Sequence, residues 1–247
     1  NEFACTWSPD GAQFWYSARP PGGQNRIMVS HRRERGWTVP EPASFGGAFP
    51  NNEPHVGADG QKLYFGSRRP LPDGTPSGHF HTWVARKQDA GWGEPAYFGP
   101  GMFVSTTQRG EVYTTDITGF AGGGLVVYEP DGAGGFGAPR QVFREPLPGG
   151  RRRSHACVDR TGRFLIYNSG GGEEGLGGDD LYLVWRRPDG SWGRPRHLGA
   201  QINSPGHDYG ASLSPDGCWM FYGRHQDIWW VNLKKYLEAH PELGPDA

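Results

Sequence analysis

Cysteine is scarce in this sequence. The 247 residues contain three cysteines, Cys5, Cys157 and Cys218, and no two of them form a Cys-x-x-Cys spacing. An odd number of cysteines without that spacing indicates neither a disulfide framework nor a zinc ribbon. We therefore expect them to behave as small buried apolar residues.

Long apolar runs and an excess of either charge are also absent. No stretch approaches the roughly 20 apolar residues that a membrane helix needs, and no signal peptide is recognisable. The first residue is not Met, so a leader or other upstream segment can be missing from this sequence. The 25 basic and 26 acidic residues give a net charge of −1. That balance supplies no electrostatic reason to expect nucleic acid or an anionic membrane as a partner.

Glycine, proline and aromatic residues, in contrast, are abundant. The chain has 41 Gly and 22 Pro, and 13% of its residues are aromatic. Aromatic residues favour strands, while Gly and Pro favour the turns between them. The composition thus predicts an all-β protein of many short strands, and the length fits one large domain.

One four-residue turn motif recurs five times along the chain. It reads SPDG at 8–11, GADG at 57–60, TQRG at 107–110, DRTG at 159–162 and SPDG at 214–217. The spacing of about 50 residues is typical of propeller blades. Asp-Gly between two strand-like segments favours a two-residue hairpin. We therefore predict that Asp10, Gly11, Asp216 and Gly217 are structural rather than catalytic.

Further strands complete the repeats. A third apolar segment follows in all five, and a fourth follows in four of them, where an aromatic residue lies three positions ahead of a proline: Trp37, Trp92, Phe136 and Trp192. Proline is tolerated on an outer edge strand. The sequence predicts a five-bladed β-propeller of four-stranded antiparallel blades. It forms a single domain over 1–247, with repeats at roughly 1–50, 51–100, 101–150, 151–206 and 207–247.

The fifth repeat lacks this fourth strand. Its third strand is followed by KKYLEAHPELG at 234–244, and Leu233, Tyr236 and Leu237 have helical spacing. We expect a short C-terminal helix there. Either an upstream segment supplies the missing strand and closes the ring, or the blade has three strands and the tail covers its edge.

The last two repeats carry a family resemblance. The segment GGDDLYLVWRRPDGSWGRPRHLGAQINSPGHDYGASLSPDGCWMFYG, followed by DIWWVNLKKYLE, resembles the TolB-type propeller repeats named for their Pro-Asp dipeptide. The resemblance covers nearly the whole chain and is weakest in the third repeat, where TQRG replaces the motif. It implies a bacterial, periplasmic or otherwise extracytoplasmic protein that acts as a binding or interaction module. It supplies no catalytic residues.

The first strand of each repeat should line the central channel, and its residues alternate between apolar and polar. We expect the apolar register, which includes Phe3 and Cys5, to pack between blades. The polar register should face the channel. The predicted residues of one channel mouth are Glu2, Asn51, Glu53, His55, Arg153, His155, His207 and Asp208. Clustered carboxylates repel, so the pKa of at least one should rise unless Arg153 or a metal ion neutralises them.

Three kinds of function stay open for this mouth. It is a water-filled polar channel without a ligand, a site for a small polar ligand or a protein partner, or the active site of a hydrolase or lyase. In one enzyme version, two of Glu2, Glu53 and Asp208 act as acid and base on a glycosidic bond, about 5–9.5 Å apart. In the other, His55, His155 and Glu53 hold one divalent metal ion that polarises a substrate oxygen.

A glycine-rich stretch at 170–180 contains Glu173, Glu174, Asp179 and Asp180. These four acidic residues lack the alternating ligand spacing of calcium loops. We interpret the stretch as an ordinary connection between the second and third strands of its repeat.

Overall fold

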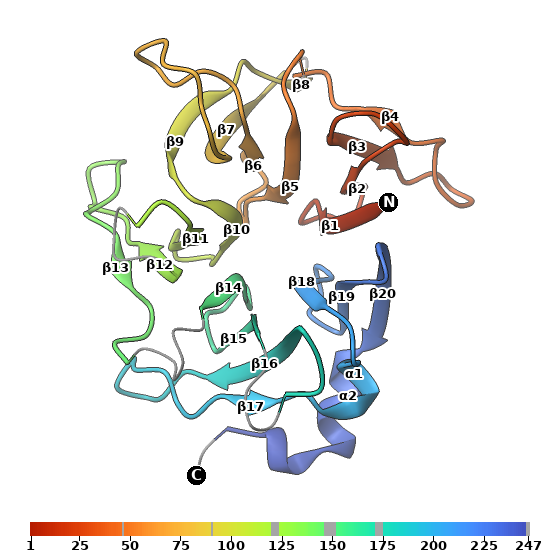
Figure 1. Ribbon diagram of the computed structural model, residues 1–247, viewed down its shortest axis with the longest axis vertical. Helices are drawn as coiled ribbons and strands as arrows, with labels where there is room; N and C mark the ends of the chain where they lie inside the picture. The colour runs from red at the N-terminus through yellow and green to blue at the C-terminus, as the bar shows by residue number, and fades with distance from the viewer. Residues whose placement is uncertain (46, 90, 120–123, 146–151, 171–174, 246–247) are drawn as a thin grey trace.

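The structure is a computed structural model that describes residues 1–45, 47–89, 91–119, 124–145, 152–170 and 175–245. Five antiparallel sheets are arranged radially around a central channel, with the first strand of each sheet innermost (Figure 1). The predicted five-bladed β-propeller is therefore confirmed. Within the described residues, no helix is long and apolar enough to span a membrane.

The blades follow one another along the chain. Blade 1 contains β1 (Glu2–Trp7), β2 (Gln13–Ala18), β3 (Arg26–His31) and β4 (Glu41–Pro42). Blade 2 contains β5 (Asn51–Val56), β6 (Lys62–Ser67), β7 (His81–Gln88), β8 (Gly91–Trp92) and β9 (Ala96–Pro100), of which β8 and β9 both pair with β7. Blade 3 contains β10 (Met102–Thr106), β11 (Val112–Asp116), β12 (Gly124–Tyr128) and β13 (Arg140–Gln141).

The last two blades differ in size. Blade 4 contains β14 (Arg153–Val158), β15 (Phe164–Gly170), β16 (Asp179–Trp185) and β17 (Arg196–His197), and the short helix α1 (Gly199–Ile202) follows it. Blade 5 has three strands, β18 (Asp208–Leu213), β19 (Trp219–Arg224) and β20 (Asp227–Asn232). The chain then forms α2 (Leu233–Ala239) and a 3₁₀ turn, η2 (Pro241–Leu243).

The recurring turn motif joins the first two strands of a blade, as predicted. The two-residue hairpin that favours Asp-Gly would give both residues a positive φ, and this turn does not. Only Gly11 takes a positive φ, of 67°, in the first turn. The Asp10 side chain accepts hydrogen bonds from the Ser8 hydroxyl, at 2.5 Å, and from the Ala12 N–H, at 2.9 Å. These bonds lower the pKa of Asp10. Asp10 therefore closes the turn through its carboxylate, a structural role that needs no unusual backbone conformation.

The hydrophobic core lies between neighbouring blades. Each fourth strand contributes an apolar residue six positions after its aromatic residue, and all of these lie in or against an interblade cluster: Ala43, Phe98, Val142 and Leu198. Cys5 and Cys157 are buried free thiols, as expected for small apolar residues, whereas Cys218 is partly exposed. Burial raises the pKa of Cys5 to about 12.

The C-terminal tail packs against the junction of blades 4 and 5. Leu233, Tyr236 and Leu243 are buried in the same cluster as Leu198, and the Tyr236 hydroxyl donates to the Leu198 carbonyl at 2.6 Å. The Asn232 side chain caps α2 by accepting from the Lys235 N–H. Within the described residues, blade 5 has three strands, which does not decide between the two alternatives. The tail fills a gap between blades instead of covering the outer edge of β20.

Candidate functional site

Every innermost strand is interrupted by a bulge at the same position. The pairing of each first strand with the second shifts register once, and a residue with positive φ lies at the shift. These residues are Ala4, Glu53, Phe103, His155 and Gly210. A bulge adds one residue to the strand and re-aims the side chains around it. Strict alternation therefore does not continue through any of the five inner strands.

The bulge residues meet across the channel. Glu53 Oε1 of blade 2 lies 3.7 Å from His155 Nε2 of blade 4. The Phe103 ring packs edge-on against His155 with ring centroids 4.8 Å apart. A side chain at Gly210 would approach the Phe103 ring to 3.3 Å, which explains a glycine at that position. Four of the five bulge residues, Glu53, Phe103, His155 and Gly210, thus lie close together across the channel, and we call them the ring. Glu53 lines both the outer mouth and the inner channel.

Side chains of the preceding blade hold the strained backbone in place. The Ser17 hydroxyl accepts from the Glu53 N–H at 2.7 Å, and the Thr115 hydroxyl accepts from the His155 N–H at 2.8 Å. Both hydroxyls belong to the second strand of the blade before. A non-glycine residue with a positive φ costs about 1–3 kcal/mol of conformational energy and persists only where the surrounding structure fixes it.

Outside the ring, the mouth forms a hollow of about 690 Å³. Its side chains include two aromatic ones, Phe3 and Tyr209, and a polar group made of Glu53, His155, Asn168, Asp179 and His207. The polar group is drawn from blades 2, 4 and 5. We call these seven residues the mouth site.

Hydrogen bonds orient His155 and Asn168. The Asn168 amide nitrogen donates to Ser154 Oγ at 3.0 Å and to Asp179 Oδ1 at 3.2 Å. The Asn168 carbonyl oxygen therefore faces His155 Nδ1, at 2.9 Å, and accepts a hydrogen bond from the Nδ1–H group. In the neutral ring, Nε2 then carries no proton and is directed at Glu53.

Glu53 is the least satisfied polar group of the mouth site. Its side chain is 7% exposed, and Oε2 has no hydrogen-bond partner among the described residues. Oε1 faces the Nε2 acceptor of His155 at a distance longer than a hydrogen bond. A buried polar atom without a partner is costly. The arrangement thus offers two acceptors to any donor that enters between them.

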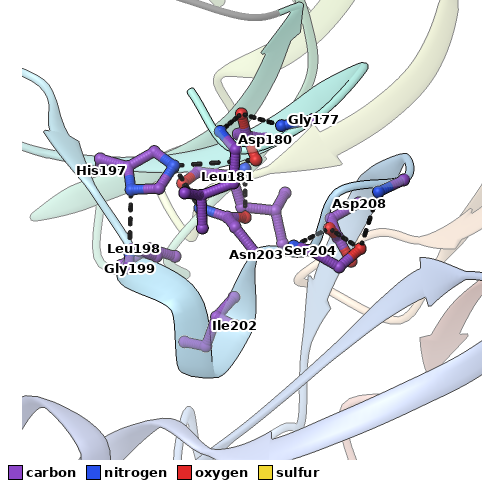
Figure 2. Close-up of polar contacts among 12 residues, drawn as sticks. Gly177, Asp180, Leu181, His197, Leu198, Gly199, Ile202, Asn203, Ser204 and Asp208 are labelled. Atoms are coloured by element: carbon purple, nitrogen blue, oxygen red, sulfur yellow. Dashed lines mark hydrogen bonds and ion pairs between the residues drawn. The ribbon is translucent and has the colours of Figure 1, made fainter. Parts of the chain in front are cut away.

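Asp179 and His207 form the second polar pair of the mouth. Asp179 Oδ2 lies 2.7 Å from His207 Nδ1, and the two residues bridge blades 4 and 5. The residue after each of them is buried and anchors the pair. Asp180 accepts from the Leu176 N–H, and Asp208 accepts from the N–H and hydroxyl of Ser204 (Figure 2).

Neighbouring contacts stiffen this junction. Asn203 exchanges two hydrogen bonds with the Leu181 backbone, at 2.7 and 3.0 Å, and its amide lies 2.9 Å from His197 Nε2 (Figure 2). Arg224 binds Asp208 Oδ1 at 2.5 Å and also donates to the Ile202 carbonyl. Buried polar contacts in the protein interior, behind the mouth hollow, therefore fix the segments that carry Asp179 and His207.

The predicted convergence of polar residues is only partly correct. Glu53, His155 and His207 lie together in the mouth site. Glu2 is exposed beside a groove between blades 1 and 5. Asp208 is fully buried against Arg224, and its carboxylate is directed into the protein. Glu2, Glu53 and Asp208 therefore do not form the predicted acid–base pair.

Three other predicted mouth residues also lie elsewhere. Asn51 is buried and donates to the Phe49 carbonyl at 2.7 Å. Arg153 donates to the Glu145 carbonyl and stacks on Phe143 at 4.4 Å. His55 lines the inner channel beyond the bulge. For Asn51 and Arg153 the bulge is the physical reason, because it reverses the facing of the residues ahead of it. His55 does face the channel, but beyond the bulge.

His55 occupies a desolvated position. Its Nε2 lies 3.0 Å from the Thr106 hydroxyl. Burial, with a smaller contribution from the nearby Arg160 charge, lowers the pKa of His55 from its ordinary 6.5 to about 3. Since the bulge separates His55 from the mouth, the predicted set of His55, His155 and Glu53 is not assembled. The described part of the chain contains no group of three His, Cys, Asp or Glu side chains placed to hold a metal ion.

Two polar residues of the mouth site are not among the predicted mouth residues. No motif or spacing in the sequence singles out Asn168, and Asp179 belongs to the glycine-rich stretch whose acidic residues lack the spacing of calcium loops. Glu173 and Glu174 of that stretch lie outside the described residues. A buried asparagine within an otherwise apolar strand is the signal for Asn168, because buried amides need several partners.

No family model and no curated protein matches this sequence. Solved structures with the same fold include TolB from Acinetobacter baumannii, with a TM-score of 0.60, 13% identity, and coverage of 96% of this chain and 53% of that chain. The chain therefore spans about half the length of that TolB.

Two enzymes share the fold as well. A thermostable family-43 glycoside hydrolase has a TM-score of 0.56 and 14% identity, with coverage of 90% of this chain and 82% of that one. A gluconolactonase from Xanthomonas campestris has a TM-score of 0.52 and 12% identity, with coverage of 94% and 85%. At these identities the likeness establishes the β-propeller fold and no shared activity.

The buried ion pair of Asp208 and Arg224 should contribute strongly to stability. The Asp208→Asn variant leaves a buried guanidinium without its counter-charge, so we expect the free energy of unfolding to fall by about 3–5 kcal/mol. Urea denaturation measures it. Glu2→Gln is the matched control, since Glu2 is exposed, and should change stability by less than about 0.5 kcal/mol. Equal effects of the two variants would contradict this placement.

His55 should make stability depend on pH. Below its ordinary pKa the unfolded chain takes up a proton that the folded protein refuses, so the unfolding free energy should fall as pH drops from 6.5 towards 3. Denaturation of wild type and His55→Gln across this range measures the effect. We expect a shallower pH dependence in the variant. Identical slopes would show that His55 is not held neutral.

Proposed function

We propose that this protein binds a small polar ligand at the mouth site and holds a donor group of that ligand against Glu53. One observation carries the proposal: Glu53 lines the hollow, its carboxylate is buried, and Oε2 has no hydrogen-bond partner among the described residues. A ligand ammonium or hydroxyl group placed there would offset the cost of that buried charge.

The size and lining of the hollow agree with a small molecule. Its volume of about 690 Å³ falls within the usual range of ligand pockets, roughly 300–1,000 Å³. Phe3 and Tyr209 supply apolar walls, while Asn168, Asp179 and His207 supply acceptors and donors. Such a mixture suits a polyol, a sugar or an amine. A side chain with a hydrogen-bond donor from a protein partner has the same chemistry. The similarity of the fold to TolB is a reason to consider a protein partner as well as a small molecule.

A screen by thermal shift with sugars, polyols and amines tests the binding proposal. We expect at least one compound to raise the melting temperature, since a ligand that binds only the folded state stabilises it. Glu53→Gln should weaken its binding about 10- to 100-fold, because the amide has one acceptor oxygen and no charge where the carboxylate has two acceptors and a charge. Glu2→Gln should bind as wild type does. Undiminished binding by Glu53→Gln would refute the role of this carboxylate.

A hydrolase is the second candidate, and the Asp179–His207 pair favours it. Asp179 holds His207 Nδ1 at 2.7 Å, so Nε2 remains available, and the ring is 67% exposed at the mouth. A carboxylate that orients a histidine is a common arrangement for a general base. In this version His207 activates water for attack on a ligand seated against Glu53.

Chromogenic glycosides and lactones test the enzyme version. If His207 is the base, His207→Gln should lower kcat/KM about 10²- to 10⁴-fold, and Asp179→Asn should also lower it. His79→Gln, a change at an exposed histidine ahead of β7, is the matched control and should retain full activity. Absence of turnover in the wild type, together with tight binding, would leave the binding proposal and remove the hydrolase.

The cellular location belongs to the same proposal. The similarity of the fold to TolB, together with the resemblance of the repeats, supports an extracytoplasmic location in a bacterium. That location, the TolB-type repeat assignment and a metal ion in the channel stay predictions.

A further inference from the structure

Backbone strain is concentrated at the mouth hollow. Among the described residues, six non-glycine residues have a positive φ, and four of them line the hollow: Glu53, His155, His225 and Gln226. Strain of this kind persists only where the surrounding structure fixes it, and it gathers at sites that bind or react. The strain thus marks the hollow independently of the unpartnered Glu53 carboxylate.

His225 and Gln226 form the two-residue turn between β19 and β20. Arg224 pairs with Asp227 across it, and the two turn residues have φ values of 51° and 64°. Such a turn strongly favours Asn-Gly or Asp-Gly, because these residues tolerate a positive φ. A histidine and a glutamine strain the turn, yet both line the hollow. The local turn chemistry therefore gives no reason for these two residues.

The mouth site has acceptors without donors. Glu53 Oε1 and His155 Nε2 are 3.7 Å apart, and neither makes a hydrogen bond within the described residues. One nitrogen can lie within about 2.7–2.9 Å of both, the usual length of a charge-assisted hydrogen bond. Glu53 Oε2 is a third acceptor without a partner there. A hydroxyl group carries one donor hydrogen, whereas a primary ammonium group carries three, so the number of acceptors fits an ammonium group.

The charges around these acceptors favour a cation. The carboxylates of the hollow are Glu53 and Asp179, whereas the guanidinium of Arg19 is exposed. Tyr209 lies in the field of both carboxylates: burial raises the pKa of its hydroxyl, and the charges of Glu53 and Asp179 raise it further. Carboxylates in a partly desolvated site attract a cation more strongly than they would in water.

Aromatic rings surround His155. The rings of Tyr209 and Phe103 have centroids 6.2 and 4.8 Å from that of His155. Gly223 lets Tyr209 lie there, since a Cβ at Gly223 would come within 2.9 Å of the Tyr209 ring. The face of an aromatic ring attracts a cation and not a neutral hydroxyl group. The surroundings of the acceptors thus favour the same class of ligand as the acceptors themselves.

We propose that the ligand of the mouth site is a small primary amine, whose ammonium group donates hydrogen bonds to Glu53 and to Nε2 of the neutral His155. His225 and Gln226 contact the remainder of the same ligand. The inference rests on the proposed binding function and narrows it to one class of ligand. Sugars and polyols without an amino group then bind more weakly than their amino counterparts.

Matched compounds test the number of donors and the charge. The probes are glucosamine with glucose and N-acetylglucosamine, and ethanolamine with ethylene glycol and choline, each titrated by isothermal calorimetry. We expect each primary amine to bind about 10-fold or more tightly than its two analogues. The hydroxyl and acetamido analogues lack the charge, and choline keeps the charge but lacks the N–H donors. Primary amines that bind no more tightly than their analogues, or do not bind, would overturn the proposal.

A capped lysine separates a small amine from a partner protein, because a lysine side chain carries the same ammonium group. The probe is Nα-acetyl-lysine N-methylamide. We expect it to bind no more tightly than glucosamine, since it lacks hydroxyl groups for the polar side chains of the hollow. Binding about 10-fold tighter than both amino probes would overturn a small-molecule ligand.

A variant of His155 tests the second acceptor. His155→Phe removes Nε2 and introduces a residue type that the bulge accepts at Phe103. We expect the preference for glucosamine over glucose to fall about 10-fold, because one hydrogen bond to the ammonium group is lost. Circular dichroism checks the fold. A preference equal to that of the wild type would overturn the role of His155.

The same titrations distinguish this inference from the proposed function. If glucose binds and loses affinity in Glu53→Gln while glucosamine binds no more tightly than glucose, the ammonium inference fails and the proposed site stands. If the binding of no probe depends on Glu53, both fail.

The turn is tested by a variant that improves its backbone chemistry. The double variant His225→Asn and Gln226→Gly introduces the favoured Asn-Gly pair, so we expect the melting temperature to rise by about 2–4 °C. Glucosamine binding should weaken about 10-fold, because two side chains of the hollow are lost. Glu238→Gln, at an exposed position on α2, is the control and should change neither quantity. A more stable double variant with undiminished binding would overturn the contact of this turn with the ligand.

Discussion

The bulge in every inner strand is the constraint on which this structure depends. Five residues with positive φ occur at one level of the channel, and four of them are not glycine. At Glu53, Phe103 and His155 the bulge turns the side chain towards the channel axis, and it moves neighbouring side chains to the opposite face. Hydroxyls of the preceding blade, such as those of Ser17 and Thr115, pair with the bulged backbone. The ring of blades thereby fixes a backbone conformation that an isolated strand would avoid.

This constraint decides which groups can do chemistry. Glu53 and His155 are opposed across the channel because both are bulge residues. Asp179 and His207 reach the mouth because the acidic residues that follow them are buried anchors. In the pairs Asp179–Asp180 and His207–Asp208, the first residue faces the mouth and the second is buried in the interior. Among the described residues, the buried carboxylates of Glu53 and of the anchor Asp180 each have one oxygen without a hydrogen-bond partner, and Glu53 is the one of the two that lines the mouth hollow.

The fold could be predicted from the sequence because its signals are local and repeated. The turn motif, the apolar third segments and the aromatic residue three positions ahead of a proline each act within a few residues, and together they specify five sheets. The site could be predicted only in part. The bulges carry no consensus residue, since Ala4, Phe103 and Gly210 share the position with two polar side chains. Alternation alone therefore assigned Asp208 to the channel, although Arg224 holds it inside.

The central claim is that Glu53 and His155 face each other across the mouth, with the proton of His155 on Nδ1. Nitrogen-15 NMR of the histidine rings measures both features. The account predicts an Nδ1–H tautomer for His155, and a change of its Nε2 resonance in Glu53→Gln that Glu2→Gln does not produce. An Nε2–H tautomer, or an Nε2 resonance that is the same in Glu53→Gln as in the wild type, would contradict it.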